Sequence, residues 1–217
     1  MILLKFPVLR CFNFAERMNY KEEILKKTFD LIMKYGIKSV SMDDISKSIG
    51  ISKKTIYQYF ENKRALIEEV IDDHINEDEQ VITQIVQQSR NAIDEIIDIA
   101  RHVLTFLKGM SPSMIYDTQK YYPRLWEKVE SQHFNFIKNI IQSNIERGQK
   151  EGLYNEDLNS EIISKIYVKQ SLAIADEETF PSTEYERSEL YKTLITYHIR
   201  GLMTTKGRKK AQSKEIE

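Results

Sequence analysis

Glycine and proline are scarce in this chain, and their scarcity constrains its fold more than any other feature. The 217 residues include seven glycines and four prolines, too few for the many tight turns of an all-β architecture. Residues 51–108 contain neither of them, which leaves room for helices of several turns. We therefore predict an all-α protein.

Capping residues and helix breakers divide the chain into about nine helices. The first runs over about 20–35 and ends at Gly36, because glycine readily takes the left-handed conformation that closes a helix. Ser41 and Ser52 are the expected N-caps of two short helices, 42–49 and 53–60, and Asn62 is the expected N-cap of a long one that ends near Ser89. Five further helices follow the apolar periodicity and the prolines, over about 92–110, 113–122, 124–152, 160–180 and 184–203.

Charge is unevenly distributed along the chain. Residues 18–66 hold ten Lys or Arg against six Asp or Glu, a balance of +4, whereas residues 67–206 hold fifteen against twenty-four, a balance of −9. A basic front on an acidic body suggests two functions, with a polyanion bound at the front.

The two short helices around Gly50 form a helix-turn-helix pattern. Gly50 allows the sharp turn, and the expected small core that fixes the second helix consists of Ile45, Ile51, Ile56 and Phe60. The second helix then presents polar side chains outward, of which lysines suit phosphates and Thr or Gln suit base edges. These outward residues are Lys53, Lys54, Thr55, Gln58 and Tyr59.

The stretch "SVSMDDISKSIGISKKTIYQYFENKRALIEEVI" (39–71) resembles the DNA-binding domain of the TetR family of transcriptional regulators. The matching pattern is Thr-aliphatic-Tyr-x-(His/Tyr)-Phe followed by Asn-Lys-x-x-Leu, and it falls on Thr55, Ile56, Tyr57, Tyr59, Phe60, Asn62, Lys63 and Leu66.

The resemblance implies a DNA-contact role for particular residues. Lys54 and Thr55 would contact bases or adjacent phosphates, Tyr57 and Tyr59 the backbone or thymine methyls, and Ser41 and Lys63 a phosphate each. Two alternatives stay open: Tyr57 equally suits the core beside Ile56, and Lys53 equally suits a solvated surface.

For the body, the resemblance implies an all-helical domain for effector binding and dimerisation. Aromatic and methionine side chains are candidates for the wall of a ligand cavity, although at helical spacing they also suit an ordinary core: Phe106, Met110, Met114, Tyr116, Tyr121, Tyr122, Trp126, Phe134 and Tyr167. The last two long helices carry more apolar surface than one core-facing stripe uses. We therefore expect a homodimer joined through a four-helix bundle, with Ile163, Ile166, Leu190, Leu194 and Tyr197 at the interface.

The expected organisation has four parts. Residues 1–17 form a loose extension. Its apolar stretch is interrupted, so it would be a poor signal peptide, and Met18 is a candidate native start. Residues 18–66 form the DNA-binding domain, 67–206 the ligand-binding and dimerisation domain, and 207–217 a charged tail. No apolar run approaches about 18 residues, so no membrane span is expected. The single cysteine, Cys11, fits a reducing, cytoplasmic location.

An enzyme is the less favoured class. The four histidines (His74, His102, His133 and His198) are far apart in the sequence, and neither a metal-ligand spacing nor a nucleotide-binding glycine motif occurs. We expect no cofactor and no metal. The expected function is a sequence-specific DNA-binding regulator, a repressor that a small-molecule effector releases from a near-palindromic operator. The alternative is a DNA-binding regulator or architectural protein without an effector, and ligand-dependent release would distinguish the two.

Overall fold

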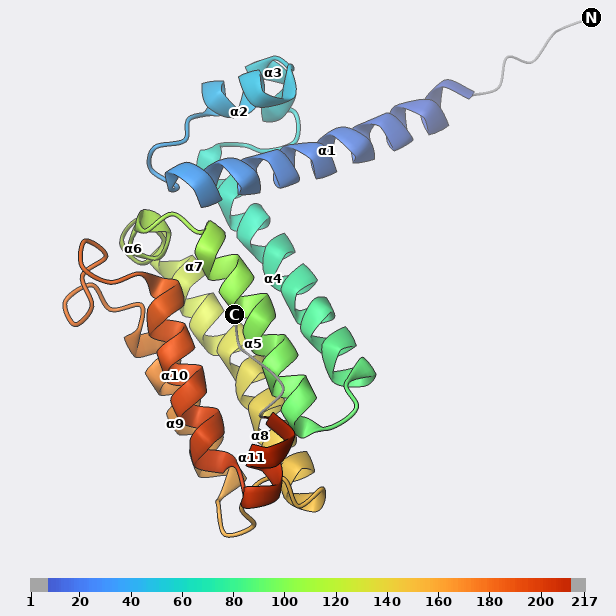
Figure 1. The fold of residues 1–217 in the computed structure, drawn as a ribbon. Helices are drawn as coiled ribbons and strands as arrows, with labels where there is room; N and C mark the ends of the chain where they lie inside the picture. The colour runs from blue at the N-terminus through green and yellow to red at the C-terminus, as the bar shows by residue number, and fades with distance from the viewer. Residues whose placement is uncertain (1–7, 212–217) are drawn as a thin grey trace, which may run out of the picture. The chain divides into compact units, whose positions relative to one another are not determined.

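The computed structural model describes residues 8–211, with side chains from Tyr20 onward, and these residues are predominantly helical (Figure 1). They form eleven α-helices and one π-helical segment, and their only β feature is an isolated bridge between Tyr154 and Met203. The predicted all-α class is confirmed. The chain folds into two compact units that divide between His74 and Ile75, within helix α4 (Lys63–Gln88).

The first unit contains α1 (Val8–Tyr35), α2 (Met42–Ile49), α3 (Lys53–Tyr57) and the start of α4. Helix α1 begins at Val8 instead of near Tyr20, so residues 8–17 continue the helix rather than forming a loose segment. Residues 1–7 lie outside the described part. Helix α3 ends at Tyr57, earlier than the expected Phe60.

The predicted N-caps of α2 and α3, Ser41 and Ser52, are confirmed, whereas Asn19, also a predicted N-cap, lies inside α1. The Ser41 hydroxyl accepts a hydrogen bond from the Asp44 amide, and the Asp44 carboxylate accepts one from the Ser41 amide at 2.9 Å, which completes a capping box. The hydrogen bonds from Ser41 lower the pKa of Asp44. Gly50 has φ 78°, and its amide donates to the Ser46 carbonyl; this left-handed residue makes the turn between α2 and α3.

The second unit is built around four helices that run side by side (Figure 1). Helix α5 (Ala92–Gly109) packs on α8 (Phe134–Lys150) and on α10 (Arg187–Leu202), and α9 (Ser160–Ala173) packs on both α8 and α10. Two shorter helices, α6 (Ser113–Tyr121) and α7 (Pro123–Lys128), precede α8. Because α5 is buried along most of its first half, it serves as the centre of this bundle.

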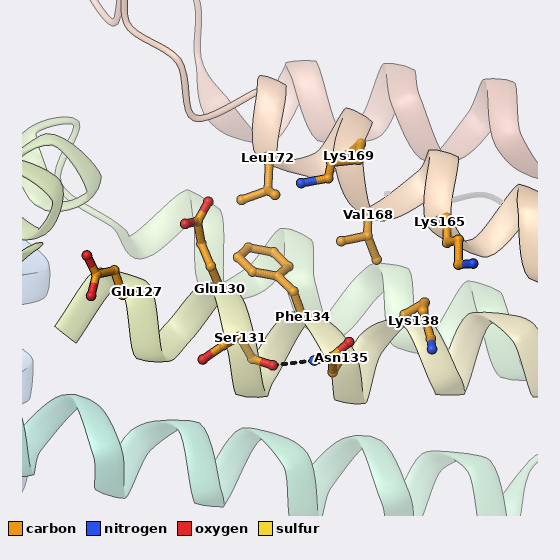
Figure 2. A pocket seen from close by; sticks show the side chains of 10 residues that line it. All are labelled: Glu127, Glu130, Ser131, Phe134, Asn135, Lys138, Lys165, Val168, Lys169 and Leu172. Carbon is orange, nitrogen blue, oxygen red and sulfur yellow. Dashed lines mark hydrogen bonds between the residues drawn. The ribbon is translucent and has the colours of Figure 1, made fainter. Parts of the chain in front are cut away.

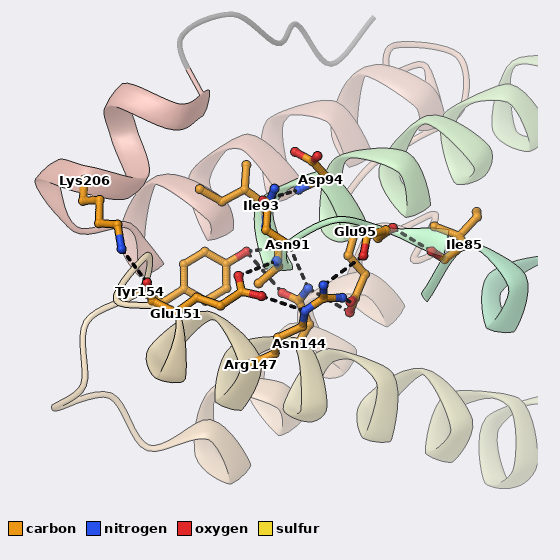
Figure 3. Close-up of polar contacts among 12 residues, drawn as sticks. Ile85, Asn91, Ile93, Asp94, Glu95, Asn144, Arg147, Glu151, Tyr154 and Lys206 are labelled. Atoms are coloured by element: carbon orange, nitrogen blue, oxygen red, sulfur yellow. Dashed lines mark hydrogen bonds and ion pairs between the residues drawn. The ribbon is translucent and has the colours of Figure 1, made fainter. Parts of the chain in front are cut away.

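A buried polar network joins the start of α5 to the end of α8 (Figure 3). Arg147 donates to Glu95 at 2.7 Å, to Glu151 at 2.9 Å and to the Ser89 carbonyl at 2.9 Å. Asn144 donates to Glu95 at 2.9 Å and to the Ala92 carbonyl at 2.8 Å. The network therefore satisfies a carboxylate whose side chain is only 3% exposed, which would be costly to bury unpaired.

Two expected helices of the body differ from the structure. The expected helix over 124–152 is divided into α7 and α8 by the π-helical segment η1 (Val129–His133). Helix α9 ends at Ala173, well before Pro181. The loop that follows is held by Arg187, whose guanidinium donates to the Ile174 and Phe180 carbonyls. Those contacts, together with its ion pair to Glu177, stabilise an irregular path that local periodicity does not reveal.

The predicted charged tail is also partly structured. Residues Thr205–Ala211 form helix α11, and the Lys206 ammonium donates to the Glu151 carbonyl at 2.7 Å. This helix and the division of 124–152 bring the helix count to eleven, where about nine were expected. Residues 212–217 of the tail lie outside the described part.

Gly148 is a packing residue within α8. Helix α8 continues past it to Lys150, and the ring of Tyr154 covers its Cα so closely that an added Cβ would lie 2.0 Å from Tyr154 Cδ2. The Tyr154 hydroxyl in turn donates to the Ala92 carbonyl at 3.1 Å. The absence of a side chain at position 148 therefore allows the Tyr154 hydroxyl to reach the polar network.

We predict opposite effects for two glycine-to-alanine changes. Gly148→Ala should destabilise the protein by about 2 kcal/mol or more, because the buried Tyr154 ring must move. Gly201→Ala in α10 should be neutral or stabilising by up to about 1 kcal/mol, since nothing lies within 4 Å of its Cβ position. Urea denaturation of both variants checks this. A Gly148→Ala variant as stable as the parent would show that the ring does not occupy this position.

Candidate nucleic-acid interface

Helix α3 presents one polar face to solvent. Lys53, Lys54, Tyr57 and Gln58 are exposed, whereas Ile56 is fully buried on the opposite side. Tyr57 is 50% exposed, so the structure places it on the surface and not in the core. Thr55 and Tyr59 are half-buried at the edges of this face. The surface that the sequence predicted for DNA contact is therefore continuous and available.

Two of these side chains also help to hold α3 in place. The Lys53 ammonium lies 3.0 Å from the Asp43 carboxylate of α2, and its hydrogen bond to that carboxylate raises the pKa of Lys53. The Thr55 and Ser52 hydroxyls lie 2.9 Å apart at the start of the helix, and the Ser52 hydroxyl accepts from the Thr55 amide. Lys53 and Thr55 thus help to position α3. Lys54 and Gln58 are the exposed polar side chains that contribute least to its position.

Lys63 has a structural contact that the sequence did not indicate. Its ammonium donates to the Ile37 carbonyl at 2.6 Å, in the loop between α1 and α2, so the first residue of α4 is tied to that loop. An ammonium has three donors, so this one hydrogen bond does not preclude the predicted phosphate contact. The predicted phosphate role of Lys63 is therefore accompanied by a positioning role within the unit.

The residues expected to line a ligand cavity in the body differ in how deeply they are buried. Met114, Tyr122 and Tyr167 are buried, while Phe106, Met110, Tyr121 and Trp126 are half-buried. Tyr116 is 40% exposed and accepts a hydrogen bond from Lys120. The Tyr167 hydroxyl lies 3.1 Å from that of Tyr191, and both belong to the core between α9 and α10. Only Phe134 of the candidates borders the groove described below.

Two histidines that are distant in the sequence meet at one carboxylate. His102 of α5 lies 2.6 Å from Asp78 of α4, and His133 lies 3.7 Å from the same carboxylate and 3.3 Å from Glu79. The hydrogen bond to the Asp78 carboxylate raises the pKa of His102. His198 is different, because burial lowers its pKa to about 4. Among the residues that the structure describes, no group of three or more His, Cys, Asp or Glu is arranged to hold a metal ion.

The expected dimer helices leave apolar side chains uncovered. Ile166 of α9 is 46% exposed and Tyr197 of α10 is 69% exposed, while Ile163, Leu190 and Leu194 are half-buried. Ile162, which the prediction did not include, is 55% exposed. Helices α9 and α10 pack against each other, so these residues lie on adjacent helices.

The helix-turn-helix region matches a known family. Residues 24–70 match the model of the bacterial regulatory proteins of the tetR family. The chain belongs to the TetR family. This confirms the resemblance of residues 39–71 and identifies the protein as a helix-turn-helix transcriptional regulator.

Curated relatives of this TetR-family chain are also regulators. The HTH-type transcriptional regulator YvaF of Bacillus subtilis is 22% identical over 186 residues, which cover 83% of this chain and 94% of the relative. The negative regulator IcaR of the biofilm operon icaADBC of Staphylococcus aureus is 24% identical over 161 residues, which cover 73% and 75% respectively.

Solved structures share the fold of this TetR-family chain. A TetR-family regulator from Agrobacterium tumefaciens has a TM-score of 0.67 at 14% identity and covers 87% of this chain and 100% of its own. The regulator FadR from Bacillus subtilis, solved with stearoyl-CoA, has a TM-score of 0.59 at 16% identity, with 83% and 98% covered. No helix within the described residues of the TetR-family chain is long and apolar enough to cross a membrane.

We predict that two lysine-to-methionine changes in this TetR-family unit separate positioning from DNA contact. Lys63→Met should lower stability by about 1–2 kcal/mol, because the hydrogen bond to the Ile37 carbonyl is lost, and should weaken binding to all DNA sequences alike. Lys54→Met should change stability by no more than about 0.5 kcal/mol and weaken DNA binding only. Thermal unfolding and fluorescence anisotropy with duplex DNA measure the two effects. Equal stability of the Lys63→Met variant and the parent would contradict the positioning role.

Proposed function

We propose that the protein is a transcriptional repressor that binds a near-palindromic operator as a homodimer and is released by a small-molecule effector. The exposed face of α3, with Lys53, Lys54, Tyr57 and Gln58, is the observation that carries this proposal. It offers two cations for phosphates and polar side chains for base edges on the second helix of a helix-turn-helix, the helix that enters the major groove in this motif.

Several findings support the repressor and effector parts of the proposal. Regulators of this family bind DNA operators and small-molecule effectors and act as dimers. IcaR is named a negative regulator, and FadR was solved with stearoyl-CoA. Helix α4 runs through both compact units of this chain. A change in the position of α4 in the second unit would therefore reach the first unit along a continuous backbone.

Release requires that the effector distinguish two states of the protein. A ligand that binds the DNA-bound and released forms equally well leaves their ratio unchanged. A preference of about 1.4 kcal/mol for the released form lowers the apparent operator affinity only tenfold. An effective inducer must therefore make contacts in the released form that the DNA-bound form does not allow.

We predict sequence-specific binding to duplex DNA that weakens steeply with salt, because several phosphates are neutralised. Selection from a random duplex pool should recover a near-palindrome with half-sites about 34–36 Å apart. Gln58→Ala or Lys54→Ala should alter preference at particular base pairs, whereas a change at Ser41 should weaken all sequences alike. Salt-independent binding, or a pool that yields no enriched sequence, would refute the DNA-binding proposal.

We predict that the exposed apolar residues of α9 and α10 form the dimer interface. Ile166→Glu together with Tyr197→Glu should yield a monomer, because each places an unpaired charge in a buried four-helix interface. Both side chains are largely exposed in the single chain, so the fold itself should survive. The Leu194→Glu change tests the same surface from a half-buried position.

Light scattering at micromolar concentration should give twice 25.7 kDa for the parent and 25.7 kDa for the double variant, with operator binding lost in parallel. Val81→Glu, a change at an exposed apolar residue of α4, is the matched control and should stay dimeric. A double variant that remains a dimer would place the interface elsewhere.

A further inference from the structure

A groove on the second unit lies between the helix pair α7–α8 and helix α9 (Figure 2). Its volume is about 540 Å³, within the range of about 300–1,000 Å³ typical of small-molecule sites. Phe134 on its wall is one of the predicted cavity residues, but the sequence did not reveal the groove itself, because its two sides come from segments 27 or more residues apart in the chain.

The middle of the groove is apolar. Phe134, the first residue of α8, lies opposite Val168 and Leu172 of α9 (Figure 2). Val168 belongs to the bundle core and is 8% exposed, and Phe134 and Leu172 pack against that core. This part of the groove is therefore a rigid apolar wall, and the burial of a hydrocarbon segment against it would be favourable.

The two ends of the groove carry opposite charge. Glu127 and Glu130 lie together at one end, and Lys138 and Lys165 lie at the other, with Lys169 above the apolar middle (Figure 2). The Lys165 ammonium donates to Glu161 at 2.6 Å, and Lys138 also acts on that carboxylate. Lys165 and Lys138 therefore both act on this one carboxylate. With Lys169 the groove has three ammonium groups, which leaves positive charge for a further anion.

The acidic end is shaped by a helical irregularity. Glu130 and Ser131 belong to the π-helical segment η1, and both border the groove. Such segments in α-helices frequently occur at functional sites. The Asn135 side chain donates to the Ser131 carbonyl across this segment, as the dashed line in Figure 2 shows.

We propose that this groove binds an amphipathic organic monoanion. Its carboxylate would lie at the end with Lys138 and Lys165, with Lys169 one helical turn further along α9, and its hydrocarbon chain would lie over Phe134 and Val168. The inference rests on the proposed function, of which it would be the effector site. From Glu130 to Lys138 the helix rises by about 12 Å at 1.5 Å per residue, so a chain of medium length spans the groove. A second carboxylate at the far end would be repelled by Glu127 and Glu130.

A series of ten-carbon probes tests both the charge order and the apolar middle. Isothermal titration of the full chain with decanoate should give binding, with 10-aminodecanoate at least as tight, because its ammonium meets the acidic end. Decanedioate should bind at least tenfold more weakly than decanoate, and decylamine and acetate should bind more weakly still. Decylamine binding as tightly as decanoate would overturn the proposal, as would a series in which no probe binds.

Charge reversal locates the carboxylate. Lys138→Glu with Lys169→Glu should weaken decanoate at least tenfold, whereas Lys138→Arg with Lys169→Arg should retain it. Lys192→Glu, an exposed lysine of α10 outside the groove, should bind decanoate like the parent. Wild-type affinity in the double Glu variant, with folding verified by circular dichroism, would refute the assignment.

Operator binding is measured separately in the same samples. Decanoate that binds the parent, depends on the two lysines and lowers operator affinity supports both proposals. Decanoate that binds in this way but leaves operator affinity unchanged supports the groove and counts against effector-induced release. Release of the operator by a ligand that the double Glu variant still binds normally would support the proposed function and overturn the groove as its effector site.

Discussion

The ion pair between Arg147 and Glu95 is the contact around which the second unit is organised. Glu95 lies on the buried face of α5 with a side chain only 3% exposed, and a carboxylate in that position requires a cation and further donors. Arg147 and Asn144, one turn apart on α8, supply both. Although burial opposes it, the hydrogen bonds to Glu151 and Glu95 raise the pKa of Arg147, so the cation persists at any ordinary pH.

The same network extends to the ends of the neighbouring segments. Arg147 also holds the Ser89 carbonyl at the end of α4, and the Glu151 carboxylate accepts the Ala92 amide at 2.9 Å. The backbone around 151–154 is then fixed by the Tyr154 ring over Gly148 and by Lys206 of α11. These contacts set the register between α5 and α8 at their shared end. They thereby also fix the position of α8, which forms one side of the groove.

The candidate DNA interface depends on shorter-range chemistry, and for that reason much of it was predictable. The caps at Ser41, Ser52 and Asn62 and the left-handed Gly50 act within three or four residues, so the sequence alone indicates where α2, α3 and α4 begin. The exposed face of α3 follows from burial of Ile56 on the opposite side. Lys63 is the exception, because its partner, the Ile37 carbonyl, lies 26 residues away.

The sequence by itself determined the helical class, the helix-turn-helix with its caps, and the family. It also determined the apolar excess on the last two helices. Each of these depends only on local residue spacing or on a short contiguous motif. Tertiary structure decided the rest. It brought Glu95 to Arg147 and His102 to Asp78, ended α9 at Ala173 through contacts of Arg187, and divided the helix over 124–152 at a π-helical segment. It also placed Phe134 opposite Val168 in a charged groove. Such pairings depend on which helix faces meet in the bundle, and the periodicity of one helix carries no information about its partner.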